Sequence, residues 1–209
     1  MKKYISEFIG TFFLVLVIGL TVNGGTGAMA PIAIGVALMA LVYAGGHISG
    51  AHYNPAVTLA IFMRKKMSGA DVLPYMIAQL AGGALAAFTT SFLLDGKMPV
   101  EAPVIADVTR AIIGEVLGTF ALVYVVLNVA TVKSTAGNSY YGIAIGLTVT
   151  AMAYALGGFS GGAFNPAVAV GVSVMKMLSW NNIWLFFVGN FAGAAIAALL
   201  FNMMNKDEA

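Results

Sequence analysis

Two asparagines in matching surroundings are the residues best suited to handle a polar ligand. The tetrapeptide Asn-Pro-Ala-Val occurs at Asn54–Val57 and again at Asn165–Val168, at an offset of 111 in the numbering. An Asn amide offers two donor protons and one acceptor oxygen, so each box can hydrogen-bond a small polar molecule. Asn is also a favoured helix N-cap, and Pro is favoured at the first helical position. The boxes therefore predict two helix starts and these candidate site residues: Asn54, Pro55, Ala56, Asn165, Pro166 and Ala167.

Other groups capable of chemistry are few. Glu7 and Glu115 open matching Glu-x-x-Gly-Thr-Phe segments, and His47 and His52 precede the first box. Two histidines without cysteine or a neighbouring acid are too few for a metal site. We expect no metal and no cofactor. An enzyme is not expected either, because general acid–base or metal chemistry would need a larger set of such groups.

The composition indicates a protein that lies in a lipid bilayer. Apolar residues make up 60% of the chain and charged residues 9%, against about 25% charged in soluble domains. The net charge is only +2 and the longest basic run is Arg64-Lys65-Lys66, so nucleic-acid binding is not expected. Lys2-Lys3 and the following apolar run resemble a signal peptide that ends at Ala28-Met29-Ala30. We expect no cleavage, because it would delete the repeat partner of the Glu115 helix.

A duplication organises the chain. The offset that relates the two boxes also relates 32–35 to 143–146, and an offset of 108 relates the Glu7 segment to the Glu115 segment. We expect a single domain over 1–209, with repeats at 1–104 and 105–209 joined by the linker Asp95–Asp107. Apolar segments long enough to cross about 30 Å of hydrocarbon occur at 5–24, 30–47, 71–94, 108–131, 140–157 and 182–204.

The fold class that follows is an all-α membrane protein of six transmembrane helices and two half-helices. Three spans per repeat is an odd number, so the second repeat must enter from the opposite side, and the repeats are inverted. The half-helices, expected over 55–63 and 166–175, are about half a bilayer long and enter from opposite faces. We expect 47–53 and 158–164 to be non-helical, which at this depth is tolerated inside protein or along a water-filled cavity.

These features resemble the aquaporins of the major intrinsic protein family. The resemblance covers nearly the whole chain and rests on both Asn-Pro-Ala boxes, the 46–52 loop and the paired Glu-x-x-Gly-Thr-Phe helices. It implies that Glu7 and Glu115 are buried and support the re-entrant loops. It also implies that His47 lies in the cytoplasmic half of the pore, and that the protein is a homotetramer with a pore in each protomer.

The selectivity filter departs from the family pattern. Family members usually carry Arg directly after the second box, where this chain has Val168. The resemblance places the other filter positions at Ile34, Ala153 and Gly162, so the ring would be aliphatic and small. The Asp that marks glycerol facilitators is absent, because Ala169 takes its place. Some plant tonoplast members also have Val after the second box, and the resemblance to them implies broader permeation by neutral solutes.

We therefore expect a passive transmembrane channel for water and small neutral solutes that excludes protons and ions. One alternative is a facilitator mainly for glycerol, urea or ammonia. An alternative of another class is a secondary transporter, which shares inverted repeats but needs a coupling-ion site.

Lysine and arginine placement indicates the orientation in a plasma or inner cell membrane. With both termini cytoplasmic, seven of these residues lie inside: Lys2, Lys3, Arg64, Lys65, Lys66, Lys133 and Lys206. Three lie outside or near the outer face: Lys97, Arg110 and Lys176.

Overall fold

The computed structural model describes residues 1–95, 97 and 99–206, and these residues are helical apart from their connections. Residues 96 and 98 of the expected linker and residues 207–209 of the expected domain lie outside the described residues. The α-helices are α1 (Lys2–Asn23), α2 (Ala30–Ser49), α3 (Pro55–Met63), α4 (Gly69–Leu93), α5 (Val108–Ala130), α6 (Tyr141–Ser160), α7 (Pro166–Val174) and α8 (Ile183–Met204). Short 3-10 turns precede α2, α6 and α8 at Gly27–Met29, Lys133–Thr135 and Trp180–Asn182.

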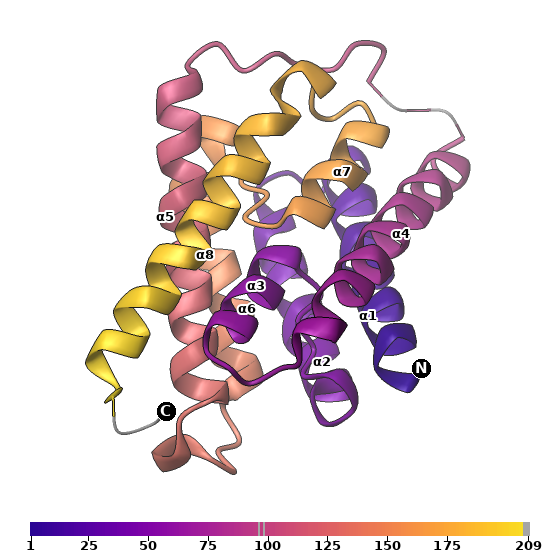
Figure 1. Cartoon of the computed structure of the whole chain (residues 1–209). Helices are drawn as coiled ribbons and strands as arrows, with labels where there is room; N and C mark the ends of the chain where they lie inside the picture. The colour runs from indigo at the N-terminus through magenta and orange to yellow at the C-terminus, as the bar shows by residue number, and fades with distance from the viewer. Residues whose placement is uncertain (96, 98, 207–209) are drawn as a thin grey trace.

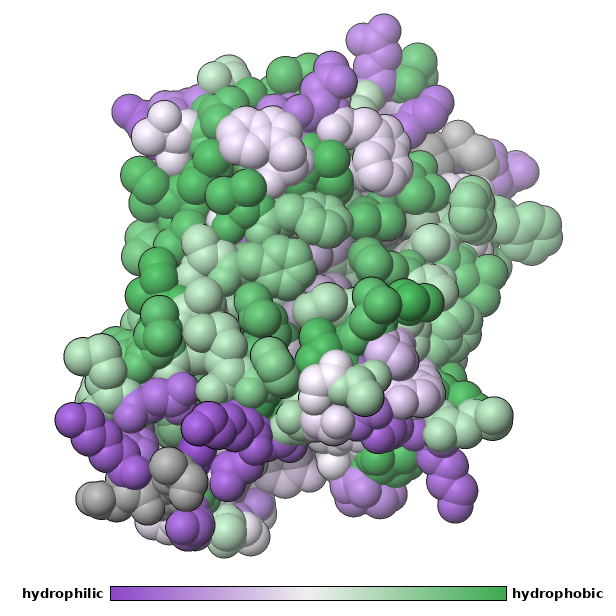
Figure 2. All heavy atoms as spheres, viewed as in Figure 1, coloured by the Kyte–Doolittle hydropathy of each residue, from purple (hydrophilic) through white to green (hydrophobic). Residues whose placement is uncertain are grey.

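Six of the helices described are long and apolar enough to cross a membrane: α1, α2, α4, α5, α6 and α8. The other two, α3 and α7, have nine residues each and are about 14 Å long. Figure 2 shows apolar side chains over the middle of the face in view and hydrophilic side chains at its top and bottom edges. The predicted class, an all-α membrane protein with six spans and two half-helices, is confirmed.

The long helices form a bundle around the two short ones (Figure 1). α1 packs on α4, α5 packs on α8, and α2 crosses α6. In Figure 1, α1 and α4 run upward from the end of the molecule that carries the N-terminus, while α5 and α8 run downward. We call that lower end the N-terminal face, and the other end the opposite face.

Small residues let the backbones approach where helices cross. A side chain at Gly82 of α4 would collide with the backbone of Phe8 in α1, and one at Gly193 of α8 would collide with the backbone of Val116 in α5. Close packing of this kind is the main attraction between helices in lipid, where apolar burial contributes little. The bundle is therefore tight at the level of the short helices.

The re-entrant segments are shorter than the sequence indicated. We expected 47–53 and 158–164 to be non-helical, but α2 continues to Ser49 and α6 to Ser160. Each helix ends at a glycine in the left-handed region, Gly50 at φ 87° and Gly161 at φ 94°. The amide of that glycine still donates to the carbonyl four residues back, so the helical hydrogen bonds run to the glycine before the chain turns.

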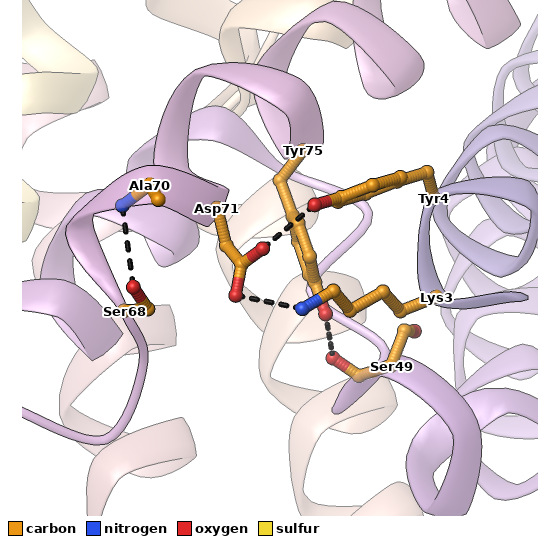
Figure 3. Close-up of polar contacts among 7 residues, drawn as sticks. All are labelled: Lys3, Tyr4, Ser49, Ser68, Ala70, Asp71 and Tyr75. Carbon is orange, nitrogen blue, oxygen red and sulfur yellow. Dashed lines mark hydrogen bonds and ion pairs between the residues drawn. The ribbon is translucent and has the colours of Figure 1, made fainter. Parts of the chain in front are cut away.

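Polar contacts on the N-terminal face join α1 to α4, and α4 to the end of α2 (Figure 3). The Lys3 ammonium and the Tyr4 hydroxyl both donate to the Asp71 carboxylate at 2.7 Å. One turn further along α4, the Tyr75 hydroxyl donates to the backbone carbonyl of Ser49 at 2.9 Å. Helix α4 is therefore attached both to the start of α1 and to the point at which α2 turns into the first re-entrant loop.

Candidate functional site

The two asparagines meet inside the bundle. Asn54 caps α3 and Asn165 caps α7, each accepting at its side-chain oxygen from the amide two residues on. The Asn54 amide nitrogen donates to the carbonyl of Phe164 at 2.9 Å, and the Asn165 amide nitrogen donates to the carbonyl of Tyr53 at 2.8 Å. Each asparagine therefore binds the backbone just before the other, and the two helix N-termini are held face to face.

Glu115 lies beneath the second re-entrant loop and is fully buried. One carboxylate oxygen accepts from the Ser160 hydroxyl at 2.6 Å and the Ala163 amide at 3.0 Å. The other accepts from the Phe164 amide at 2.7 Å and the Asn190 side chain at 2.6 Å. Four donors converge on two oxygens, which suits an ionised carboxylate because that form only accepts.

Glu7 repeats this arrangement beneath the first loop. It is also fully buried, and it accepts from the Ser49 hydroxyl at 2.6 Å and the His52 amide at 3.0 Å. The Tyr53 amide and the Gln79 side chain donate to its second oxygen at 2.6 and 2.8 Å. Each carboxylate thus supports its re-entrant loop by accepting hydrogen bonds from two backbone amides of that loop. At membrane depth these amides would otherwise have no hydrogen-bond acceptor.

A further polar network occurs on the first-repeat side alone among the residues described. The His52 ring lies 3.0 Å from the Thr58 hydroxyl, and Gln79 also donates to that hydroxyl at 2.9 Å. The equivalent positions in the second repeat are Ala163 and Ala169, which cannot make these contacts. The two halves of the site therefore share the carboxylate contacts but differ in the polarity of the packing behind the loops.

A cavity of about 1080 Å³ runs past both asparagines. Near the N-terminal face its lining includes His47, Lys133 and Tyr141, and near the opposite face it includes Asn23 and Pro99. Between these ends its walls are mainly aliphatic side chains of α1, α2, α5 and α6. A long apolar passage with a few polar groups at its middle suits a small polar molecule that moves through rather than one that stays bound.

The residues expected to form the filter also line this cavity: Ile34, Ala153, Gly162 and Val168. Val168 is 5% exposed, and the other three are half-buried. Pro55, Ala56, Pro166 and Ala167 are buried in the first turns of α3 and α7 rather than on the wall. The two prolines and two alanines thus shape the helix starts, while the asparagines face the cavity.

Sequence reasoning missed the serines that complete the carboxylate clusters. Ser49 and Ser160 are the last residues of α2 and α6, and each hydroxyl donates to its Glu while accepting from the amide two residues on. The two serines are related by the same offset as the Asn-Pro-Ala boxes. The repeat alignment therefore contained the signal that could have identified them.

Comparison with known proteins agrees with this architecture. Residues 1–201 match the family profile of the major intrinsic proteins. Aquaporin AqpM of Methanothermobacter thermautotrophicus is 35% identical over 99% of this chain and 98% of its own length. Aquaporin NIP1-1 of Oryza sativa subsp. japonica is 35% identical over 98% of this chain and 74% of its own.

A solved structure shares the fold. The X-ray structure of the aquaglyceroporin from Plasmodium falciparum matches with a TM-score of 0.79 and 23% identity, over 98% of this chain and 94% of that one. The profile and the relatives establish that the chain belongs to the major intrinsic protein family, an integral multi-pass class of membrane channel. The resemblance noted from the sequence is thereby confirmed.

Proposed function

We propose that this protein is a passive channel for water and small neutral solutes and that it excludes protons and ions. The observation that carries the proposal is the asparagine pair at the middle of the cavity. Each amide nitrogen has two protons, of which one binds the opposite loop. The second proton has no acceptor among the residues described, and it is available to the oxygen of a passing molecule.

Helix electrostatics support exclusion of cations. The N-termini of α3 and α7 point at the same position, and each carries about +0.5 elementary charge. In a cavity with aliphatic walls this field repels a cation more strongly than it would in water. The two amides also orient a central water molecule so that it donates outward in both directions. That orientation interrupts a chain of waters that could relay a proton.

The filter residues support weak discrimination among neutral solutes. Ile34, Ala153, Gly162 and Val168 supply no side-chain donor and little bulk. Family members with Arg after the second box have a charged donor there, which this chain lacks. We therefore propose that urea, ammonia or glycerol pass in addition to water. The ratio of solute permeability to water permeability distinguishes a water channel from the alternative, a facilitator mainly for these solutes.

The secondary-transporter alternative has little support. A transporter needs an intramembrane site for its coupling ion. The intramembrane carboxylates found among the described residues are Glu7 and Glu115, and each already accepts four hydrogen bonds from protein donors. Binding an ion would require giving up those contacts, and with them the shape of the loops.

We further propose a plasma or inner cell membrane location with cytoplasmic termini. The seven lysines and arginines assigned to the inside lie in the first turn of α1, between α3 and α4, or just after the ends of α5 and α8, in keeping with the positive-inside rule. We propose a homotetramer because the resemblance to the aquaporins of the major intrinsic protein family implies one. The chain is proposed to act as one channel unit over 1–209, with repeats 1–104 and 105–209.

Stopped-flow light scattering of proteoliposomes tests the function. Reconstituted protein should raise osmotic water permeability above that of protein-free liposomes, with a low temperature dependence and no requirement for an ion gradient. The same vesicles, placed in a gradient of glycerol, urea or ammonia, give the permeability to each solute and so rank the permeants. Water flux equal to that of protein-free liposomes would contradict the proposal, and flux that depends on sodium or proton gradients would favour the transporter alternative.

A further inference from the structure

The repeat relation gives each residue of the proposed filter a counterpart on the other side of the asparagine pair. The counterparts are related to the filter residues by the offset of the two Asn-Pro-Ala boxes, and they line the same cavity. We call Ile34, Ala153, Gly162 and Val168 the outer ring, and their counterparts the inner ring: Ile145, Val42, Ala51 and Val57. Because the repeats are inverted, the inner ring lies between the asparagines and the N-terminal face.

The inner ring carries more side-chain bulk than the outer ring. Two of the four positions are identical in type, with isoleucine and valine on both sides. The other two differ in one direction. Val42 has two more side-chain carbons than Ala153, and Ala51 has one more than Gly162. The cavity is also lined by α1 and α5, whose residues are related by the offset of 108. Leu14 and Leu122 are the same residue type. Ile18 has one methylene more than its counterpart Val126, which offsets only part of the difference in bulk between the two rings.

Burial agrees with the difference in bulk. The inner-ring residues Val42, Ala51, Val57 and Ile145 are 3%, 7%, 3% and 6% exposed, and all four belong to one contiguous apolar cluster. Three outer-ring residues are half-buried instead, so water-sized molecules reach them more easily. Three of the four matched pairs thus differ in exposure, and in each of them the inner-ring residue is the more buried.

The backbone at Ala51 gives an independent reason to assign this ring a role. Ala51 has φ 51°, in the left-handed region that favours glycine, and the counterpart Gly162 has φ 68°. A glycine would fit the first position without strain, yet this chain places a methyl group there. The Ala51 amide donates to the Ser49 hydroxyl at 3.1 Å, and the neighbouring amides bind Glu7, so the methyl group is held firmly at the cavity wall.

We propose that the constriction that discriminates among solutes is the inner ring, Val42, Ala51, Val57 and Ile145, rather than the outer ring. The inference rests on the proposed channel function and specifies where it is selective. A ring of four aliphatic side chains offers no hydrogen bonds to replace those lost by a solute, so it selects by size. Water passes in single file, while urea and glycerol are slowed at the N-terminal side of the asparagines.

The chain contains a matched pair of positions for the test. Val57 and Val168 are the same residue type at equivalent positions, in the first turns of α3 and α7, and are 3% and 5% exposed. Val57→Ala and Val168→Ala remove the same atoms from the inner and outer rings. Each variant is reconstituted as the full chain, and the urea-to-water and glycerol-to-water permeability ratios are measured by stopped-flow light scattering.

Val57→Ala should raise both ratios by on the order of tenfold, the discrimination that a small change in apolar bulk can produce. Val168→Ala should change them much less. Val42→Ala, which opens the same ring from α2, should act like Val57→Ala and serves if the latter fails to fold, as judged by gel filtration in detergent. An effect of Val168→Ala equal to or larger than those of the inner-ring variants overturns the inference while leaving the channel function intact. A parent protein without water flux overturns both.

Discussion

Replacement of Glu115 by glutamine should loosen the second re-entrant loop at a cost that follows from the hydrogen bonds. The carboxylate accepts from Ser160 and Ala163 at one oxygen and from Phe164 and Asn190 at the other. A glutamine keeps one oxygen and presents two donor protons in place of the second. Ser160 can rotate its hydroxyl to accept, but a backbone amide cannot. In either orientation of the Gln side chain one buried backbone amide therefore loses its partner.

The magnitude combines two losses. An unpaired buried donor costs about 1–3 kcal/mol, and the remaining hydrogen bonds lose the extra strength of a charged acceptor. A total of about 3 kcal/mol is a reasonable sum, which for a chain of this size corresponds to a fall of about 10 °C in the unfolding midpoint. Water permeability per protein should fall too, because Gly162 and Ala163 of the same loop line the cavity.

Thermal unfolding in detergent and stopped-flow water permeability check Glu115→Gln together. The matched control is Glu101→Gln, which makes the same chemical change at an exposed position of the α4–α5 linker. Glu7→Gln should behave like Glu115→Gln, since the first loop has the same set of donors. An unfolding midpoint and a water permeability equal to those of the control would refute the reasoning that the buried carboxylate holds the loop.

Three further outcomes are expected. Val168→Arg should add a hydrogen-bond donor and a charge beside the second asparagine. In proteoliposomes it should therefore reduce urea and glycerol flux more than water flux. Solute flux equal to that of the unmodified protein would mean that Val168 does not face the passage. Mercurials should leave water permeability unchanged, because the chain has no cysteine, and rapid block reversed by a thiol would contradict this. The unmodified protein should exclude protons although it lacks the usual Arg. Asn165→Asp should conduct protons, because it adds negative charge where α7 begins. A pH-sensitive dye inside the vesicles measures proton entry in both cases.

The sequence predicted the helices well because membrane spans have a strong local signature. About 20 apolar residues are needed to cross the bilayer, and an Asn-Pro pair favours a helix start whatever surrounds it. The predicted half-helix over 55–63 matches α3 to the residue, and the prediction of 166–175 exceeds α7 by one. The loop prediction was wrong in its first three residues on both sides, because His47 and Gly158 carry no signal that ends a helix. Gly50 and Gly161 do, by turning left-handed.

Side-chain partners were less accessible to sequence reasoning. The sequence identified Asn54 and Asn165 as a pair but could not show that each amide binds the backbone carbonyl before the other. These two contacts join residues that are 110 and 112 positions apart in the chain. Tyr75 and Gln79, which support the first loop, lie on α4, and only the tertiary packing brings Gln79 to Glu7 of α1 and Tyr75 to Ser49 of α2.

The sequence by itself determined the number of spans, the inversion of the repeats and the residues at the helix starts, because these depend on local composition, spacing and counting. Its motifs also carried the resemblance to the family. Only the tertiary structure decided which donors meet each buried carboxylate and how closed the passage is on either side of the asparagines. The physical reason is that the passage is bounded by side chains from helices far apart in the chain. Val42, Val57 and Ile145 belong to three different helices. Their spacing across the cavity depends on how closely those helices pack, which no segment encodes alone.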